Sequence, residues 1–212
     1  MIPTGHSQVK RVHPMTNRRV PARPSARKRI FDTASELFYR KGIRAVGVDA
    51  IAAQADTTKM SLYRSFDSKD ALVAEWLRDH DAKFWKKWDS MSQKYPDDPR
   101  KQLRAAFALL AKHVSDPDAR GCPMANAAVE ITEKDHPARQ VIEAHKTKLR
   151  ARLATLCEQT GAREPALLAD ELFLLMEGAQ VSTVLGVRIP PQSIARPAEA
   201  LIDTHIAAKR RT

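Results

Sequence analysis

The sequence has 212 residues, of which 43% are hydrophobic and 29% are charged, a composition typical of a globular protein with a packed core. Its longest hydrophobic runs, FALLA and LFLLM, fall far short of the ~20 residues that a membrane-spanning helix needs, and no signal-peptide core is recognisable. We therefore expect a cytoplasmic protein with no membrane partner. The two cysteines, Cys122 and Cys157, lack the spacing of a zinc site, which favours buried thiols and predicts neither a metal nor a disulfide.

Positive charge is concentrated at the N-terminus. Residues 1–31 contain eight Lys and Arg side chains and no acid, so they carry +8 of the formal net charge of +11. The same segment has four prolines and little hydrophobic material, which is typical of chain that does not fold by itself. We expect residues 1–24 to be a disordered basic arm that contacts DNA phosphates or the minor groove. A solvated tail, or a misassigned start codon, is the alternative.

Helical periodicity begins at Ser25, which is a suitable N-cap for a first helix of about four turns. Gly42 suits the positive φ angle that commonly follows a last helical turn. The apolar face of this predicted helix consists of Ile30, Ala34, Leu37 and Phe38.

A helix, a tight turn and a second helix are predicted over residues 48–66. Apolar residues at the spacing i, i+3, i+4, i+7 indicate a helix of about two turns, starting near Gly47 or Asp49. Asp56 is one of the few residue types that accept a positive φ angle in the turn, and Thr58 can cap the next helix. In that helix Leu62 and Phe66 lie at i, i+4 and are expected to face inward.

The remaining sequence is predicted to be helical, because no segment alternates with period two for long enough to indicate a strand. Short loops rich in Pro, Gly and Asp separate the helices. We expect an all-α fold of about nine helices, with later helices near residues 68–92, 99–115, 121–132, 136–160, 165–187 and 196–209.

The segment IFDTASELFYRKGIRAVGVDAIAAQADTTKMSLYRSFDSKDALVAEWL resembles the DNA-binding region of TetR-family transcriptional regulators over residues 28–77. The matching features are LF and Gly42 at the end of the first helix, VDAIAAQA in the second, TKMSLYRSF in the third and SKDALV opening the fourth. The resemblance implies a helix-turn-helix DNA-binding domain at residues 25–70, and a helical effector-binding and dimerisation domain at residues 71–212.

Three departures from the family pattern lie in the motif itself. Val46 and Gly47 replace a common pair of hydroxyl residues before the second helix, where glycine can also serve as an N-cap. Asp56 and Thr57 occupy turn positions where the family often has glycine and valine. Met60 replaces a small residue, and its side chain can alter base preference by contacting a thymine methyl group.

The resemblance implies roles for individual side chains. Phosphate or base contacts are expected from Thr58, Lys59, Tyr63 and Arg64, with Met60 and Ser61 near base edges and Lys69 on a phosphate. The alternatives are partial core packing for Tyr63 and a solvated charge for Arg64. Residues 48–70 carry a net charge of −1, so much of the attraction to DNA is expected from Arg27, Lys28, Arg29 and the arm.

The C-terminal two thirds is expected, from the resemblance, to bind a small-molecule effector and a second copy of the chain. Candidate effector-binding residues are Trp76, Phe84, Phe107, Leu110, Met124, Asn126 and Met176. Ordinary core packing is the alternative for the aromatic residues among them. Candidate dimer-interface residues are Leu168, Leu172, Leu175, Ala179, Leu201, Ile202, His205 and Ile206, with packing inside the chain as the alternative.

We expect a regulator, more specifically a repressor released from double-stranded operator DNA by an effector, without a cofactor. A nucleophilic enzyme built on Cys122 or Cys157 is a rival interpretation, but no catalytic histidine motif or phosphate-binding loop supports it. A basic architectural DNA-binding protein is a second rival, and it predicts little sequence preference and no response to small molecules.

Overall fold

The computed structural model describes residues 23–206, and this part of the chain consists of nine α-helices without a strand. The predicted basic arm therefore lies outside the described residues, except for Arg23 and Pro24. The helices are Ala26–Lys41 (α1), Val48–Gln54 (α2), Lys59–Ser65 (α3), Lys69–Ser92 (α4), Pro99–Val114 (α5), Pro123–Glu130 (α6), Pro137–Gln159 (α7), Pro165–Val184 (α8) and Gln192–His205 (α9).

The predicted helix order and the predicted all-α class are confirmed. Only the last helix differs appreciably, because α9 begins at Gln192 and includes Pro197, whereas the sequence predicts a start near residue 196. Pro197 is the sixth residue of α9, so it lies inside the helix and removes one internal backbone hydrogen bond. The predicted end near residue 209 lies beyond the part that the structure describes.

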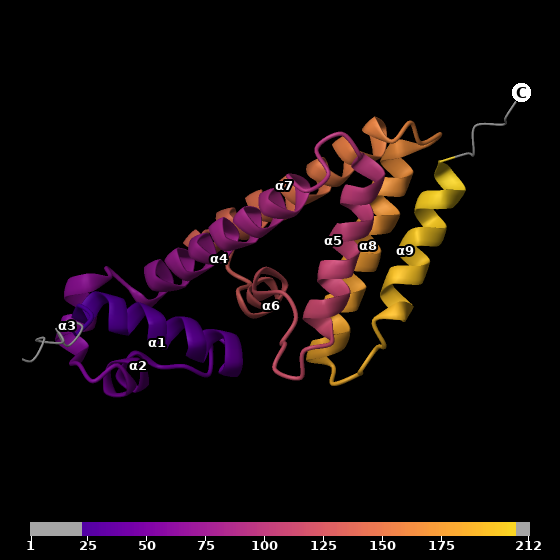
Figure 1. The fold of residues 1–212 in the computed structure, drawn as a ribbon. Coiled ribbons are helices and arrows are strands. Elements are labelled where there is room, and N and C mark those ends of the chain that lie inside the picture. Colours follow the sequence, from indigo (N-terminus) through magenta and orange to yellow (C-terminus); the bar gives the residue numbers. More distant parts are fainter. Residues whose placement is uncertain (1–22, 207–212) are drawn as a thin grey trace, which may run out of the picture.

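The helices divide into two ends joined by a long pair (Figure 1). α1, α2 and α3 form a small bundle at one end, and α5, α8 and α9 lie together at the other. α4 and α7 run side by side between these ends, and α6 lies close to α4 and α7 in the middle. α4 thus joins α1–α3 to the other end of the molecule.

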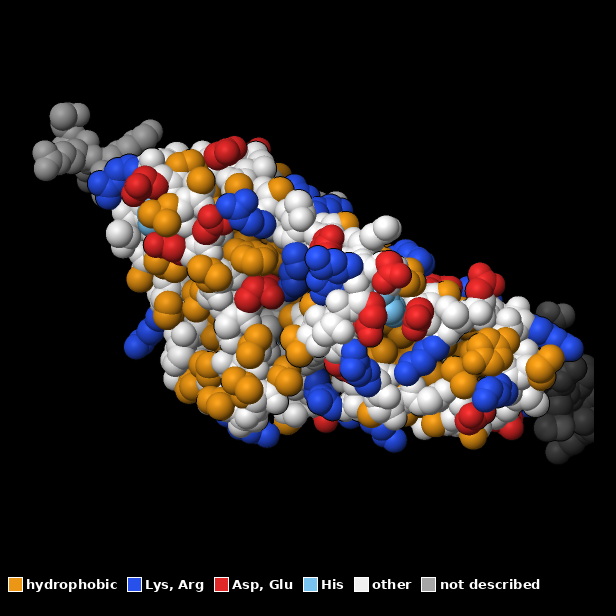
Figure 2. Space-filling view, turned by 180° about the vertical axis from the view of Figure 1, so that it is seen from behind, with side chains coloured by type: hydrophobic (Ala, Val, Ile, Leu, Met, Phe, Trp, Pro, Cys, Tyr) orange, Lys and Arg blue, Asp and Glu red, His pale blue; other side chains and the backbone are white. Residues whose placement is uncertain are grey.

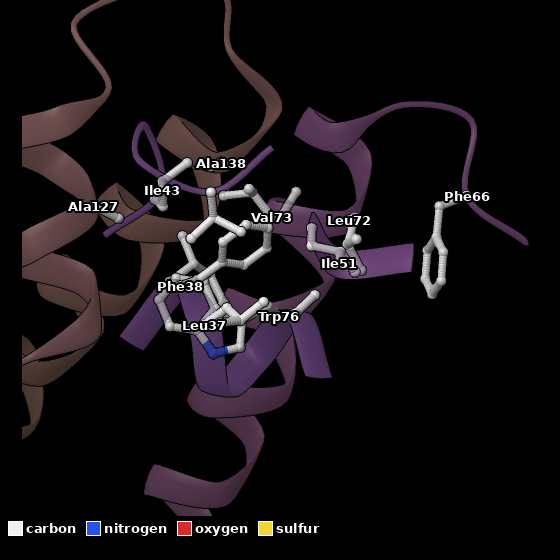
Figure 3. Close-up of a cluster of buried hydrophobic side chains, with 14 of the residues drawn as sticks. Leu37, Phe38, Ile43, Ile51, Phe66, Leu72, Val73, Trp76, Ala127 and Ala138 are labelled. Atoms are coloured by element: carbon white, nitrogen blue, oxygen red, sulfur yellow. The ribbon is translucent and has the colours of Figure 1, made fainter. Parts of the chain in front are cut away.

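The first hydrophobic core joins α1–α3 to the start of α4 and to α6. Figure 3 shows Phe38 of α1 beside Trp76 of α4, with their ring centroids 5.5 Å apart. Ala127 of α6 and Ala138 of α7 belong to the same cluster. The core thus extends past residue 70, and α6 packs with the helices that carry the helix-turn-helix.

A second hydrophobic core holds the C-terminal helices together. It includes Trp85 and Trp88 from α4, Phe107 from α5, Leu153 from α7 and Leu172 from α8, all of them buried. Burying a large apolar side chain stabilises a fold by roughly 1.5–3 kcal/mol, so this cluster makes the far end a rigid support for α4 and α7.

No helix of the described residues is long and apolar enough to cross a membrane.

Candidate nucleic-acid interface

The turn between α2 and α3 depends on Asp56, whose φ angle is 49°. It is the one residue other than glycine with a positive φ among residues 23–206, which confirms the sequence prediction for this position. An aspartate tolerates this conformation better than most residues because its short carboxylate side chain can form hydrogen bonds with the nearby backbone.

Two arginines hold this turn from the side of α1. Arg29 donates to the carbonyl oxygens of Ala55 at 3.0 Å and of Asp56 at 2.9 Å. Arg23 forms an ion pair with the Asp56 carboxylate. The Arg29 guanidinium therefore binds carbonyl groups at the end of α2 and keeps its positive charge, so its contribution to the attraction of DNA stays a prediction. These contacts also give a reason for the unusual Asp56, since it binds an arginine that a glycine could not.

α3 begins at a hydroxyl cap, as predicted. The Thr58 side chain accepts a hydrogen bond of 3.1 Å from the backbone N–H of Ser61, and the hydroxyl groups of the two residues lie 3.0 Å apart. Such a cap contributes about 1 kcal/mol to a helix that has only seven residues. The Ser61 hydroxyl is therefore already hydrogen-bonded to the Thr58 hydroxyl. A contact between Ser61 and a base must share the Ser61 hydroxyl with Thr58.

The two faces of α3 separate clearly. Leu62 is fully buried, and Phe66 directly after the helix is 4% exposed, so both anchor the segment to the core. On the opposite face Met60 is 64% exposed and Tyr63 is 44% exposed. Arg64 is also exposed and has no ion-pair partner among residues 23–206. Met60, Tyr63 and Arg64 thus form an outward surface, which we call the recognition face.

Most cations around the recognition face are paired with acids. Lys59 lies 3.1 Å from Asp49, and Lys28 lies 2.7 Å from Asp32. Arg27 donates to both carboxylate oxygens of Glu75, at 2.9 and 2.7 Å. These ion pairs are solvent-exposed and contribute little to stability, so a phosphate group can replace the carboxylate at small cost. In agreement, Figure 2 shows blue and red side chains interspersed and no continuous basic surface on the face in view.

Lys69 faces inward more than the sequence suggests. Its Nζ donates a hydrogen bond of 2.6 Å to the carbonyl oxygen of Ile43. Burial lowers the pKa of Lys69, and the nearby charges of Asp70 and Glu130 oppose this shift. Its role as a phosphate contact stays a prediction, while the observed contact fixes the α1–α2 loop against the start of α4.

The same loop is bound to α6. The backbone N–H of Arg44 donates to Glu130 Oε2 at 2.8 Å, and Arg44 Nε donates to the Glu130 carbonyl at 2.7 Å. A Cβ atom on Gly42, whose φ is 88°, would lie only 3.0 Å from Glu130 Oε1. Residues 42–44 therefore follow the C-terminal end of α6 closely, and no local sequence signal indicates this contact.

The N-terminal end of α6 is held as well. The Tyr39 hydroxyl of α1 accepts a hydrogen bond of 2.7 Å from the backbone N–H of Arg120. Gly121 has a φ of 66°, and a Cβ atom there would lie 2.5 Å from the carbonyl oxygen of Gln180 in α8. Glycine is required by this close approach. α6 and its preceding loop thus connect α8 to the helix-turn-helix domain.

The predicted effector-binding residues do not gather around one cavity. Trp76 and Met124 are buried in the first core, and Phe107, Leu110 and Met176 are buried in the second, with Phe84 against it. The Asn126 amide donates to the Arg120 carbonyl at 2.7 Å, so it stabilises the loop before α6 instead of facing a cavity. Their role in binding an effector stays a prediction.

Half of the predicted dimer residues are buried within the chain, and the role of the set at an interface stays a prediction. Within the chain, Leu168 and Leu172 of α8, Ala179 of α8 and Ile202 of α9 are buried in the second core, which is the alternative stated for them above. Leu175, Leu201, His205 and Ile206 are partly buried. His205 Nε2 lies 3.0 Å from Glu171 Oε2, which fixes α9 to α8. The large apolar residues exposed on α8 and at its C-cap are Leu167, Leu174, Val181, Val184 and Leu185.

Neither cysteine has a catalytic environment. Burial raises the pKa of the Cys157 thiol to about 12, which makes its thiolate scarce. Cys122 is buried, and Lys146 Nζ lies 3.6 Å from its sulfur while also pairing with Glu177. No histidine in the part of the chain described forms a hydrogen bond with either sulfur. Nor does that part contain a group of three His, Cys, Asp or Glu side chains arranged for a metal.

Two family models match the chain. The model described as bacterial regulatory proteins, tetR family, matches residues 30–76, and the model described as tetracyclin repressor-like, C-terminal domain, matches residues 99–196. The first covers the helix-turn-helix and the second covers most of the helices that follow α4.

Solved structures and curated proteins agree with these models. A TetR-type transcriptional regulator of Streptomyces avermitilis MA-4680 is 30% identical, with a TM-score of 0.75 over 86% of this chain and 98% of that one. SCO4454, a TetR-family regulator of Streptomyces coelicolor, is 27% identical, with a TM-score of 0.79 over 86% of this chain and 96% of that one. The HTH-type transcriptional repressor DhaR of Mycobacterium sp. (strain GP1) is 24% identical over 74% of this chain and 82% of its own length.

An exposed recognition face on the second helix of a helix-turn-helix, followed by a helical C-terminal domain, defines the class of DNA-binding transcriptional regulators. Within that class, the chain belongs to the TetR family of bacterial regulatory proteins.

Proposed function

We propose that this regulator is a homodimeric repressor that leaves its operator when a small-molecule effector binds. In this proposal residues 25–70 contact DNA and residues 71–212 bind the effector and the second subunit. The observation that carries the DNA-binding part is the recognition face of Met60, Tyr63 and Arg64, which the buried Leu62 and Phe66 hold outward. The names of relatives such as DhaR and KstR2, both HTH-type transcriptional repressors, favour repression over activation.

The proposed contacts divide into two kinds. Lys59, Arg27, Lys28 and Lys69 are suited to phosphate groups, which position the protein without reading sequence. Arg64 can donate two hydrogen bonds to a guanine, and the Met60 side chain can contact a thymine methyl group. The Tyr63 hydroxyl can reach either. Thr58 and Ser61 come close to the DNA but are also engaged in capping α3.

We propose that the dimer forms through the exposed side of α8 instead of the residues predicted from the sequence. Leu167, Leu174, Val181 and Leu185 repeat at seven, seven and four residues, so they lie along one side of the helix. Figure 2 shows hydrophobic side chains gathered at the end of the molecule that holds α5, α8 and α9. A contiguous exposed hydrophobic patch favours a protein interface. A twofold dimer would present two recognition faces to a pseudo-palindromic operator.

α6 and the loop before it connect the proposed effector-binding domain to the helix-turn-helix domain. The C-terminal end of α6 contacts the α1–α2 loop at Arg44, and the loop before α6 contacts Tyr39 of α1 through Arg120 and abuts α8 at Gly121. An effector that favours a different position of α6 would therefore alter the separation of the two recognition faces in the dimer.

Repression can be tested by in vitro transcription. Chromosomal fragments bound by the protein are selected, and transcripts from the best fragment are measured with increasing protein and then with candidate small molecules. We expect transcription to fall as protein is added and to recover with one class of compound. Transcription that rises with protein, or binding with no sequence preference, would instead support an activator or the architectural protein considered above.

A further inference from the structure

A groove between α4 and α7 contains a buried histidine that the proposed DNA binding does not use. Its volume is about 320 Å³, near the lower end of small-molecule pockets. It is lined by Arg78 and Asp81 from α4 and by Gln140, Val141, Ala144, His145 and Lys148 from α7. None of the side chains predicted above to bind an effector lines this groove.

His145 is held in one orientation. Its side chain is only 2% exposed, and its Nδ1 lies 2.7 Å from Asp81 Oδ1. Trp85 Nε1 donates to the same oxygen at 2.8 Å, so Asp81 acts as an acceptor for both rings. A neutral His145 must then carry its proton on Nδ1, which leaves Nε2 as an acceptor. No side chain or backbone group in residues 23–206 donates a hydrogen bond to this Nε2.

The groove also carries cations without acidic partners. Arg78 and Lys148 form no ion pair with any residue from 23 to 206. Arg78 also lines the neighbouring groove between α1 and α4, where Arg27 and Lys83 are paired with Glu75 and Asp79. Lys148 Nζ lies 4.2 Å from the centre of the Trp85 ring, so the ring helps to position it.

The charges decide which ligand fits. Burial lowers the pKa of His145 more than its hydrogen bond to Asp81 raises it, so the ring is neutral at pH 7. The lining carries a formal charge of +1 from Arg78, Lys148 and Asp81. A monoanion compensates this charge, whereas a dianion such as phosphate overcompensates it beside the Asp81 carboxylate. Val141 and Ala144 add an apolar wall.

We propose that the α4–α7 groove binds a small organic carboxylate that also carries a hydroxyl group. Its carboxylate would pair with Arg78 and Lys148, its hydroxyl would donate to His145 Nε2, and its apolar body would lie on Val141 and Ala144. Such a ligand bridges α4 and α7. Because α4 carries α1–α3, the ligand would change the position of the recognition face, and this consequence rests on the proposed function.

Binding itself is tested without DNA, so that it can fail or succeed independently of the proposed function. The full chain is titrated with 4-hydroxybenzoate by isothermal titration calorimetry, and 4-hydroxybenzamide serves as the uncharged probe of the same shape. We expect one saturable site per chain for the carboxylate, at least tenfold weaker binding of the amide, and at least tenfold weaker carboxylate binding in both Arg78→Gln and Lys148→Gln. Lys86→Gln, an exposed change on α4 outside the groove, should bind as the wild type does.

Arg78 and Lys148 are exposed, so both variants should keep the wild-type melting temperature. An absence of saturable binding, or equal affinity in the double variant Arg78→Gln/Lys148→Gln, would overturn the proposal of a ligand site. Operator binding without a ligand is measured on the same samples. If that binding is intact while calorimetry shows no site, only the groove proposal fails.

Discussion

The backbone N–H of Arg44 and the carboxylate of Glu130 are joined by a hydrogen bond of 2.8 Å, although 86 residues separate them in the chain. This contact fixes the loop between α1 and α2 to the end of α6. The orientation of the helix-turn-helix therefore depends on a helix that lies outside it.

Glu130→Ala should weaken operator binding through this contact. Hydrogen bonds to charged groups contribute about 1.5–3 kcal/mol, and part exposure reduces this, so we expect a loss of affinity of roughly threefold to thirtyfold. The measurement is an operator titration beside a thermal melt. Glu199→Ala, an exposed change on α9, is the control. An unchanged operator affinity in Glu130→Ala would show that α6 does not position the recognition face.

The turn should tolerate glycine at position 56 but not a β-branched residue. Asp56→Gly keeps the φ of 49° available and loses the ion pair with Arg23, so we expect a change in the free energy of unfolding of under ~1 kcal/mol. Asp56→Val forces a strained backbone and should cost about 1–3 kcal/mol. Urea unfolding of the two variants measures both values. Equal stability of Asp56→Val and the wild type would contradict the observed turn.

The basic arm should determine how strongly binding depends on salt. Residues 1–22 contain Lys10, Arg11, Arg18 and Arg19, and the helix-turn-helix itself is close to neutral. Each phosphate contact contributes about −0.9 to the slope of log K against log salt. Deleting residues 1–22 keeps Arg23 and its ion pair with Asp56, and should make the slope less negative by roughly two to four. A slope that stays the same would mean that the arm does not touch DNA.

Mild acid should destabilise the fold through His80. Its pKa is lowered from 6.5 to about 4, mainly by burial and then by the charges of His145 and His113 with Lys87, while Asp81 opposes the shift. Between these two pH values the unfolded chain binds a proton that the folded chain does not, so the free energy of unfolding falls as the pH falls. From pH 7 to pH 5 we expect a loss of about 1–2 kcal/mol from this group.

The control for this pH effect is His80→Gln, which removes the titrating group. In urea unfolding at pH 7 and pH 5, the variant should lose less stability than the wild type does. If both proteins lose the same free energy between the two pH values, His80 is not the source.

Local features of this fold could be predicted from the sequence. Ser25, Thr58 and Asp56 take the cap and turn conformations expected of them, because each depends only on neighbours within a few residues. The inward position of Leu62 and Phe66 follows from helical spacing in the same way.

Contacts between distant segments could not be predicted. No sequence feature near Arg44 predicts its contact with Glu130, and none near Asp56 predicts its contact with Arg29, because tertiary packing brings these pairs together. The orientation of α8 could not be predicted for a different reason. This helix has large apolar residues on most of its sides, so periodicity does not reveal that Leu168 and Leu172 are buried while Leu174 is exposed.

The claim that the recognition face reads DNA is tested most directly by selecting bound sequences from a randomised library. The wild type is compared with the triple variant Met60→Ala/Tyr63→Ala/Arg64→Ala, whose changed side chains are exposed and should leave the melting temperature nearly unchanged. We predict that the wild type enriches a pseudo-palindrome and that the variant enriches none, since base contacts each provide about 1–3 kcal/mol of discrimination. Enrichment of the same palindrome by the folded variant, or of no sequence by the wild type, would contradict this assignment.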